Sequence, residues 1–426
     1  MRFEFPATRV GRGPDGKLFV ELLNQDGSLV DQIPVEEIFE EYVGKRITFA
    51  VDDEPSEPAK PLFEGDLAER ARRVAEELDL RPAYQRPRDD LNAYNWLRAQ
   101  YDDRSRFLKD SFEAASPRSE REVFAWRDRL KERLEELLGL PGTPAPLSVE
   151  WGPEAEFDGL TLKKVYFQSQ PGLKVPAVLA HPEGLDEPRP AVLCLHGHNQ
   201  GKVCTLGFHH SSSNSYWGYE LAKRGFVTLS PDQLGWGERF AVAKRRYADS
   251  EKAYSRTALL LGTTSIGLRV WDAQRGLDFL QSLDVVDGER LGVIGHSGGG
   301  MICNFLAPLD DRVKAAVVSG YFCRWLDSIF TLSHCVCNYV PGILKVAECA
   351  DVLAATVPRP VFVVAGERDP IFPLAGVKAA YATLKRVYEV AGAPDLVDLD
   401  VLEGVGHSFS GRKAYPWLKE ALSAAP

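Results

Sequence analysis

Ser297 has surroundings that suit catalysis by a nucleophile. It is the middle residue of Gly-His-Ser-Gly-Gly at positions 295–299, directly after the short apolar run 291–294. A serine on a tight strand-to-helix turn has a strained backbone, so the residues two positions before and after it must be small. Both of these positions are glycine, and residues 301–306 continue as an apolar helix pattern. The sequence therefore predicts a nucleophile elbow with Ser297 as the nucleophile.

A serine hydroxyl is a poor nucleophile at neutral pH. It needs a base to accept its proton, and the base needs an acid to fix its tautomer. Loops after parallel strands meet at one edge of a sheet, so residues that follow strand patterns are candidates. We predict His407 as the base and Asp369 as the acid, because each follows an apolar strand pattern. Glu367 is the main alternative for the acid, and Glu403 is a weaker one.

Acyl transfer also needs two backbone N–H groups directed at the oxyanion. The residue after the nucleophile, Gly298, is predicted to supply one of them. The second donor arises at the turn that ends an earlier strand, where this chain has His-Gly-His at 196–198. We therefore predict that the amide of His198 supplies the second hydrogen bond.

An aromatic segment at 321–358 follows the strand pattern at 314–319 and suits an apolar pocket wall, although ordinary packing explains it equally well. His296 is adjacent to the nucleophile, and neighbouring residues cannot easily align for proton transfer. We therefore expect it to pack or hydrogen-bond in the elbow rather than act as the base. Four side chains are candidates for substrate contact: Trp236, His296, Tyr321 and Trp325.

The chain has seven cysteines. Their odd number and irregular spacing fit reduced thiols rather than a disulfide framework. The run His334-Cys335-Val336-Cys337 is similar to a metal-binding pattern, but no second ligand pair is spaced to complete a tetrahedral site. The sequence thus predicts neither a metal centre nor a cofactor.

The charge and hydropathy of the chain exclude several classes of partner. The 426 residues include 51 Lys and Arg against 61 Asp and Glu, a formal net charge of −10, which argues against nucleic-acid binding. Apolar runs are far shorter than a membrane span, and the N-terminal segment lacks the apolar core of a secretory signal. We expect a cytoplasmic protein with a small-molecule substrate and no membrane partner. Association into a homo-oligomer is compatible with the sequence.

Three regions follow one another along the chain. Residues 1–60 are predicted to form a small β-rich module, with a hairpin of 17–23 and 28–33, followed by a linker rich in proline and charge. Residues 61–145 form a helical extension, in which apolar residues recur at helical spacing across 119–138. Residues 146–426 form the catalytic domain.

The catalytic region alternates strand and helix patterns. Segments 161–167 and 174–180 are predicted to pair as antiparallel strands. Later apolar runs, at 191–195, 226–230, 291–294, 314–319, 361–365 and 397–402, alternate with helix patterns near 214–224, 267–284, 298–307 and 374–391. Such alternation indicates an α/β fold with a mainly parallel central sheet.

From about residue 150 onward the chain resembles the α/β-hydrolase superfamily, and within it the branch of dienelactone hydrolases and acetyl xylan esterases. The resemblance is carried by the stretches 195–202, 225–239 and 287–299, and by the order Ser297, Asp369, His407. Two positions depart from the branch. Dienelactone hydrolases use a cysteine nucleophile where this chain has serine, and acetyl xylan esterases usually have glutamine where Gly298 stands.

The resemblance and the predicted triad together imply a serine carboxylesterase that forms an acyl-enzyme, acting on acetylated carbohydrates or aryl esters. A peptidase similar to prolyl oligopeptidases is an alternative with the same triad order, although no propeller-length repeat precedes the hydrolase region. A catalytically silent hydrolase fold that binds a partner is the non-enzymatic alternative.

Overall fold

The computed structural model describes residues 8–12, 18–23, 29–34, 69–70, 93–103, 106–209, 216–240 and 247–423. The chain divides into two compact units, Met1–Arg88 and Asp89–Pro426. The predicted linker that ends at residue 60 lies outside the described residues.

The first unit contains a three-stranded antiparallel sheet in the order β1-β2-β3. Its strands are β1 (Thr8–Arg12), β2 (Leu18–Leu23) and β3 (Leu29–Pro34). The predicted hairpin is confirmed, since β2 and β3 are its two strands. β1 was not predicted.

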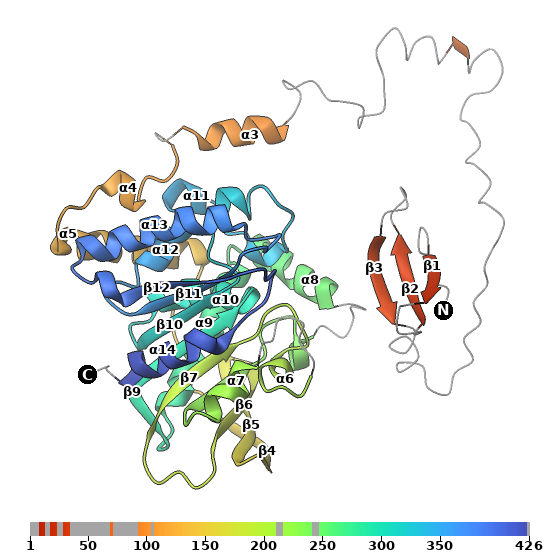
Figure 1. The fold of residues 1–426 in the computed structure, drawn as a ribbon, viewed down its shortest axis with the longest axis vertical. Coiled ribbons are helices and arrows are strands. Elements are labelled where there is room, and N and C mark those ends of the chain that lie inside the picture. Colours follow the sequence, from red (N-terminus) through yellow and green to blue (C-terminus); the bar gives the residue numbers. More distant parts are fainter. Residues whose placement is uncertain are drawn as a thin grey trace. The chain divides into compact units, whose positions relative to one another are not determined.

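The second unit is built on a nine-stranded sheet in the order β12-β11-β10-β9-β7-β8-β6-β5-β4 (Figure 1). Neighbours from β12 to β8 are parallel, and β6, β5 and β4 are added in antiparallel fashion. The strands are β4 (Glu150–Phe157), β5 (Leu160–Gln170), β6 (Leu173–Pro182), β7 (Arg189–Leu195), β8 (Val227–Pro231), β9 (Val286–His296), β10 (Val313–Ser319), β11 (Val361–Gly366) and β12 (Val397–Leu402). The predicted α/β fold with a mainly parallel sheet is confirmed.

Helices connect these strands and flank them. They are α3 (Ala93–Tyr101), α4 (Phe112–Ala115), α5 (Glu120–Leu138), α6 (Lys202–Thr205), α7 (Trp217–Ala222), α8 (Tyr247–Leu260), α9 (Ser265–Gln281), α10 (Gly298–Leu309), α11 (Ile343–Val346), α12 (Cys349–Ala354), α13 (Leu374–Val390) and α14 (Gly411–Ser423). The four helix patterns expected between strands correspond to α7, α9, α10 and α13.

Both faces of the parallel strands are buried, which explains their continuous apolar runs. On β7, Leu193 and Leu195 pack with residues of α5, α9, α10, α12 and α13. The alternate residues of the same strand, Val192 and Cys194, pack with α7 and α14. The sheet is therefore covered by helices on both sides, and its strand ends are left for a site.

Helix α5 joins the predicted helical extension to the core of this unit. The hydroxyl of Ser119 caps its first turn by accepting from the Glu122 amide, and Gly139 ends it at φ 62°. Its apolar stripe is fully or almost fully buried in the same core as the sheet: Val123, Trp126, Leu130, Leu134 and Leu138. The part of the extension from Ala93 onward thus belongs to the second unit, whereas the described residues 69–70 belong to the first.

Strand β4 was not predicted, because its sequence lacks any apolar periodicity. Seven of its eight residues are exposed. It forms the edge of the sheet, where pairing with β5 requires only backbone groups. A polar edge strand also discourages pairing with another sheet.

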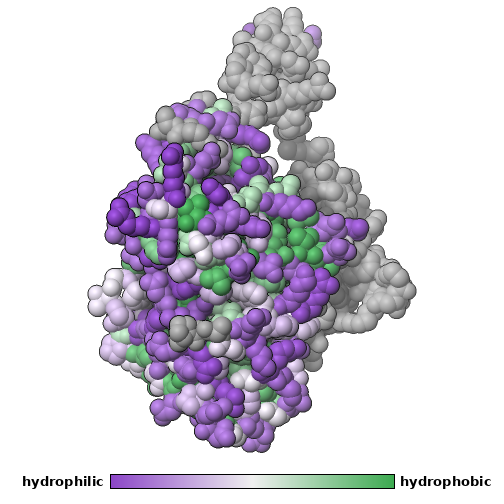
Figure 2. Space-filling view, turned by 60° about the vertical axis from the view of Figure 1, so that its left-hand side comes forward, coloured by the Kyte–Doolittle hydropathy of each residue, from purple (hydrophilic) through white to green (hydrophobic). Residues whose placement is uncertain are grey.

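One face of the second unit is largely polar. Figure 2 shows hydrophilic side chains over most of one face, with small separate groups of hydrophobic residues. None of the helices in the described parts of the chain is both long and apolar enough to span a bilayer.

Candidate active site

Ser297 lies between β9 and α10 with φ 55° and ψ −120°. This backbone conformation is strained for a residue with a side chain. The Ser297 amide donates to the Ser319 carbonyl on β10 at 2.9 Å, and its own carbonyl accepts from the Met301 amide at 2.8 Å. These bonds hold the strained turn on both sides, as a nucleophile elbow requires.

The two glycines of the elbow are required by close backbone contacts. A methyl group on Gly295 would collide with the backbone of Gly299. A methyl group on Gly299 would collide with the carbonyl of Leu195 at the end of β7. The elbow therefore fits against the neighbouring strand only without side chains at these positions.

His407 and Asp369 form a close pair in the loops after β12 and β11. The Nδ1 atom of His407 lies 2.7 Å from the Oδ2 atom of Asp369. The other carboxylate oxygen accepts from the amides of Ile371 and Phe372, each at 3.0 Å. Burial raises the pKa of Asp369, but the hydrogen bond and charge of His407 together with the two amides lower it below its usual value. The carboxylate stays ionised and can orient the imidazole.

The alternative acids are placed differently. Glu367 is exposed and accepts a hydrogen bond from the Gly404 amide at 2.7 Å. Glu403 is also exposed. Of these carboxylates, Asp369 has the hydrogen bond to His407.

His407 has a second ring nitrogen available for proton transfer. Its Nε2 atom is buried and has no hydrogen-bond partner among the described residues. The ring centroid lies 4.6 Å from that of His296, the residue bonded to Ser297. The predicted base and acid are thus paired, and the ring of the base lies beside that of the residue that precedes the predicted nucleophile.

The loop after β7 touches the elbow. A methyl group built on Gly197 would lie 3.3 Å from the Cβ atom of Ser297. A methyl group built on Gly298 would lie 3.0 Å from the Nδ1 atom and from the Cε1 atom of the His198 ring. Gly298 is the first residue of α10, where amides have no acceptor within the helix. The structure brings both predicted oxyanion residues to the nucleophile.

His196 fixes the shape of this loop. The Nδ1 atom of His196 lies 2.7 Å from the carbonyl oxygen of Gly197, within hydrogen-bond distance. Its Nε2 atom accepts from the Gln233 amide at 2.9 Å. Burial lowers the pKa of His196 to about 4, so the ring is neutral at physiological pH.

An ion-pair network with a buried Lys202–Asp232 pair also supports the loop, and sequence reasoning did not find it. The ammonium of Lys202 lies 2.6 Å from Asp232 and 2.5 Å from Glu238. Asp232 also accepts from the amides of Lys202 and Glu238, at 2.8 and 2.9 Å. The three residues stand in the stretches that carry the family resemblance, but nothing in their spacing indicates that they pair.

The four predicted substrate-contact side chains are mostly enclosed. His296 is 2% exposed, its Nδ1 atom lies 2.9 Å from the Ser319 hydroxyl, and burial lowers its pKa to about 3. Tyr321 and Trp325 lie in the hydrophobic core and contact each other. Trp236 is 7% exposed and packs edge-on against His198, 5.2 Å between ring centroids. Of the four, Trp236 and His296 lie beside the predicted machinery.

Four potential metal ligands gather next to the same loop. One ligand atom from each of His198, Glu251, Cys335 and Cys337 lies within 4.8 Å of the others. The pKa of the Cys335 thiol is lowered most by its hydrogen bond with Cys337. The hydrogen bond with His198 has the next largest effect. His334, which the sequence pattern included, instead lies 3.0 Å from the Ser328 hydroxyl. The second ligand pair that the sequence pattern lacked is thus supplied by distant parts of the chain.

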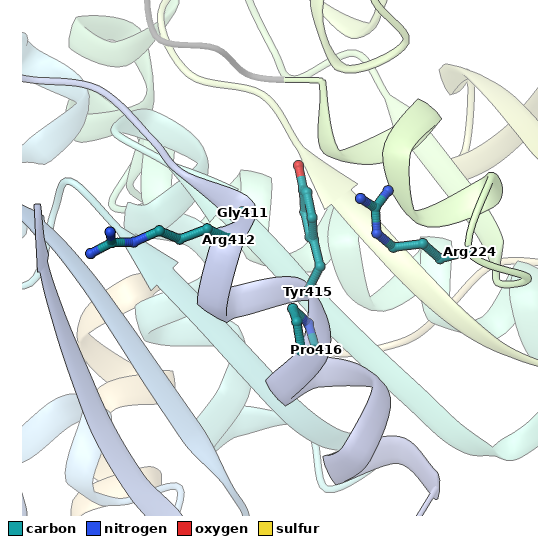
Figure 3. Close-up of a pocket in the computed structure, with 5 residues that line it drawn as sticks. All are labelled: Arg224, Gly411, Arg412, Tyr415 and Pro416. Carbon is teal, nitrogen blue, oxygen red and sulfur yellow. The ribbon is translucent and has the colours of Figure 1, made fainter.

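A hollow of about 190 Å³ lies elsewhere on the surface, at the start of α14. Figure 3 shows Tyr415 on this helix beside Arg224, while Arg412 extends to the opposite side. The Arg224 guanidinium lies 4.8 Å from the centre of the Tyr415 ring. None of the triad residues lines this hollow.

The sequence profile of the Abhydrolase family matches residues 106–405, which include the elbow, Asp369 and the loop after β7, and which end two residues before His407. The chain belongs to the Abhydrolase family. The predicted membership of the α/β-hydrolase superfamily is therefore confirmed.

This abhydrolase is similar to YtaP of Bacillus subtilis, a protein provisionally named a hydrolase. The two are 29% identical over 279 residues, which are 63% of this chain and 90% of YtaP. The likeness therefore extends over nearly the whole relative.

Two solved structures share the fold of this abhydrolase. One, from Bacteroides fragilis, is provisionally named an acetyl xylan esterase, with a TM-score of 0.68 and 18% identity over 79% of this chain and 97% of that one. The other is a glucuronoyl esterase from Solibacter usitatus, with a TM-score of 0.52 and 16% identity over 70% of this chain and 91% of that one.

Proposed function

We propose that this abhydrolase is a serine carboxylesterase that works through an acyl-enzyme. The observation that carries the proposal is the pairing of His407 with the buried carboxylate of Asp369 at 2.7 Å, beside a serine held in the strained elbow. A serine, an imidazole and a carboxylate in these roles constitute a general machinery for acyl transfer.

In the proposed first step, the Nε2 atom of His407 accepts the Ser297 hydroxyl proton as the serine oxygen attacks the ester carbonyl carbon. The carbonyl oxygen becomes an oxyanion, which the amides of His198 and Gly298 stabilise. His407 then gives its proton to the departing alkoxide. Asp369 remains ionised throughout and stabilises the imidazolium.

In the second step a water molecule takes the place of the alcohol. His407 accepts a proton from the water, whose oxygen attacks the acyl-enzyme carbonyl through a second oxyanion. Collapse of that intermediate releases the carboxylic acid and returns the proton from His407 to Ser297. The two half-reactions use the same groups, so no further proton carrier is needed.

The serine mechanism is tested with the variant Ser297→Ala. We expect it to lose p-nitrophenyl acetate hydrolysis and covalent labelling by a fluorophosphonate, while its circular dichroism spectrum and thermal unfolding match the wild type. Ser319→Ala is a matched control, since its hydroxyl contacts His296 rather than substrate, and it should keep the labelling. Labelling that persists in Ser297→Ala would refute the proposal.

For the substrate class we propose esters of carbohydrates. The support is the fold shared with proteins named for acetyl xylan and glucuronoyl esters, set against Gly298, which departs from the acetyl xylan esterase pattern. A panel of acetyl to octanoyl p-nitrophenyl esters, acetylated xylan and glucuronate methyl esters tests this. Higher kcat/KM on aryl esters than on any sugar ester, or activity on aminoacyl p-nitroanilides alone, would contradict it.

A further inference from the structure

Residues from three separate segments converge beside the catalytic loops. His198 comes from the loop after β7, Glu251 from α8, and Cys335 and Cys337 from the long segment between β10 and β11. The Nε2 atom of His198 lies 3.2 Å from the sulfur of Cys337. This arrangement combines nitrogen, sulfur and carboxylate oxygen, which are the donor atoms of protein zinc sites.

The spacing of these atoms is close to that of a tetrahedral site. Bonds of about 2.0–2.3 Å to a central ion place tetrahedral ligand atoms about 3.3–3.8 Å apart. The four atoms already lie within 4.8 Å of one another. Side-chain shifts of about 1 Å or less would bring all four into coordination distance.

The environment of Glu251 separately favours a cation at this cluster. Its side chain is completely buried. The Oε1 atom accepts from the Cys337 amide at 3.1 Å and from the Ser255 hydroxyl at 2.8 Å. The Oε2 atom is buried and has no hydrogen-bond partner among the described residues. An unpaired carboxylate oxygen in such a place is costly unless a cation or a proton satisfies it.

The charges also balance around a divalent ion. Two thiolates and one carboxylate carry three negative charges. The buried guanidinium of Arg269 donates to Tyr254 at 2.9 Å, and its charge acts on both thiols. A divalent cation together with Arg269 would neutralise the three anionic ligands in this enclosed region.

We propose that His198, Glu251, Cys335 and Cys337 bind a divalent transition-metal ion, and that this ion is Zn²⁺. Thiolate and imidazole ligands favour zinc over magnesium or calcium, which prefer oxygen. Because the protein supplies four ligands, the site is closed and structural rather than catalytic. Metal binding requires both cysteine sulfurs as thiolates, so any thiol proton still bound is released to solvent, and it involves no change of oxidation state.

The ion would tie the oxyanion loop to the segment between β10 and β11. His198 would be bound through Nε2, while its backbone amide remains free to face the oxyanion. This role for the His198 amide rests on the proposed function, whereas the metal site itself does not. The ion would act on catalysis through the position of the His198 amide.

The experiment uses the full-length chain, reduced with a phosphine and freed of metal with a chelator. It is titrated with Co²⁺, whose thiolate complexes absorb in the near ultraviolet, and the Co²⁺ is then displaced by Zn²⁺. We expect about one Co²⁺ per chain, a thiolate-to-cobalt absorption band, and an increase in melting temperature. The same stoichiometry is checked by elemental analysis of the protein as purified.

Variants assign the ligands. Cys337→Ser and Glu251→Gln should each weaken Co²⁺ binding at least about tenfold, by loss of a direct ligand. Cys323→Ser alters a buried cysteine outside the cluster and should bind Co²⁺ like the wild type. The circular dichroism spectrum of each metal-free variant reports its folding. Glu251→Gln keeps both thiols, so it remains informative where Cys337→Ser does not fold.

Three results would overturn the proposal. They are the absence of Co²⁺ and Zn²⁺ binding to the reduced protein, binding that the ligand variants leave unchanged, and a Cys335–Cys337 disulfide whose reduction creates no metal affinity. None of these bears on ester hydrolysis. Conversely, a chain that binds zinc at these residues but hydrolyses no ester would refute the proposed function alone.

Discussion

The imidazole rings of His296 and His407 lie side by side, and their surroundings differ. His407 is partly exposed and pairs with a carboxylate, while His296 is buried and pairs with the hydroxyl of Ser319. A carboxylate stabilises an imidazolium, whereas burial opposes one. His407 is therefore suited to accept and return a proton, and His296 is suited to stay neutral within the elbow.

The buried state of His296 predicts a measurable dependence of stability on pH. Its pKa is about 3 when folded and close to 6.5 when unfolded. Between these values the unfolded chain binds one more proton, so stability falls as the pH falls below about 6.5. Between pH 6 and 5 the slope in His296→Gln should be smaller than in the wild type by about 1 kcal/mol per pH unit. Urea unfolding at several pH values measures this, and equal slopes would contradict it.

The choice of acid gives a second prediction at this scale. Asp369→Asn should lower kcat by about 10³- to 10⁴-fold, because the amide cannot hold His407 in the required tautomer. Glu367→Gln is the matched control and should change kcat by less than about twofold, since Glu367 is exposed and contacts the Gly404 amide. Initial rates on p-nitrophenyl acetate compare the two. The reverse order of effects would make Glu367 the acid.

At the scale of elements, the loops after β7 and β8 are held together by charge. Lys202 begins α6, and Asp232 directly follows β8. Their side chains are 7% and 0% exposed. Removing one partner of such a buried pair leaves an uncompensated charge, which costs more than the pair itself contributes.

Lys202→Met should therefore lower the free energy of unfolding by about 3–5 kcal/mol. The double variant Lys202→Met with Asp232→Asn should recover part of this loss, because the unpaired carboxylate is gone. Chemical unfolding in urea provides both values. A loss below about 1 kcal/mol in the single variant would show that solvent reaches the pair.

The sequence predicted the strands and the pair of His407 and Asp369 better than it predicted the contacts between loops. Buried strands appear as continuous apolar runs, and chemistry-bearing residues follow those runs, so Ser297 and His407 could be found locally. Glu251 and Cys337 are 86 positions apart, and no local pattern indicates that they touch. Aromatic content alone also could not distinguish a pocket wall from the core, in which Tyr321 and Trp325 lie.

At the scale of the whole molecule, all candidate site residues lie in the unit Asp89–Pro426. The family match also begins within that unit, at residue 106. The three-stranded sheet of the first unit is complete without strands from the second. The second unit therefore holds every candidate site residue, and the first unit holds none of them.

A chain that begins at Asp89 should keep kcat/KM within about twofold of the full-length value. A chain that begins at Val149 is the control, because it also removes α5, whose buried side chains each contribute about 1.5–3 kcal/mol. We expect the second truncation to be insoluble or unfolded. Esterase assays and circular dichroism on both chains test this, and an inactive but folded first truncation would assign a catalytic role to residues 1–88.

The position of α5 also has a consequence for synthesis on the ribosome. This helix precedes all nine strands of the larger sheet, yet it packs against α9, α10, α11 and α13 (Figure 1). At about 5–20 residues per second, translation from the end of α5 to the end of α13 takes roughly 10–50 s. Until that interval ends, the nascent chain carries an apolar helix whose covering surface is incomplete. The yield of soluble protein therefore depends on how well aggregation of the incomplete chain is delayed.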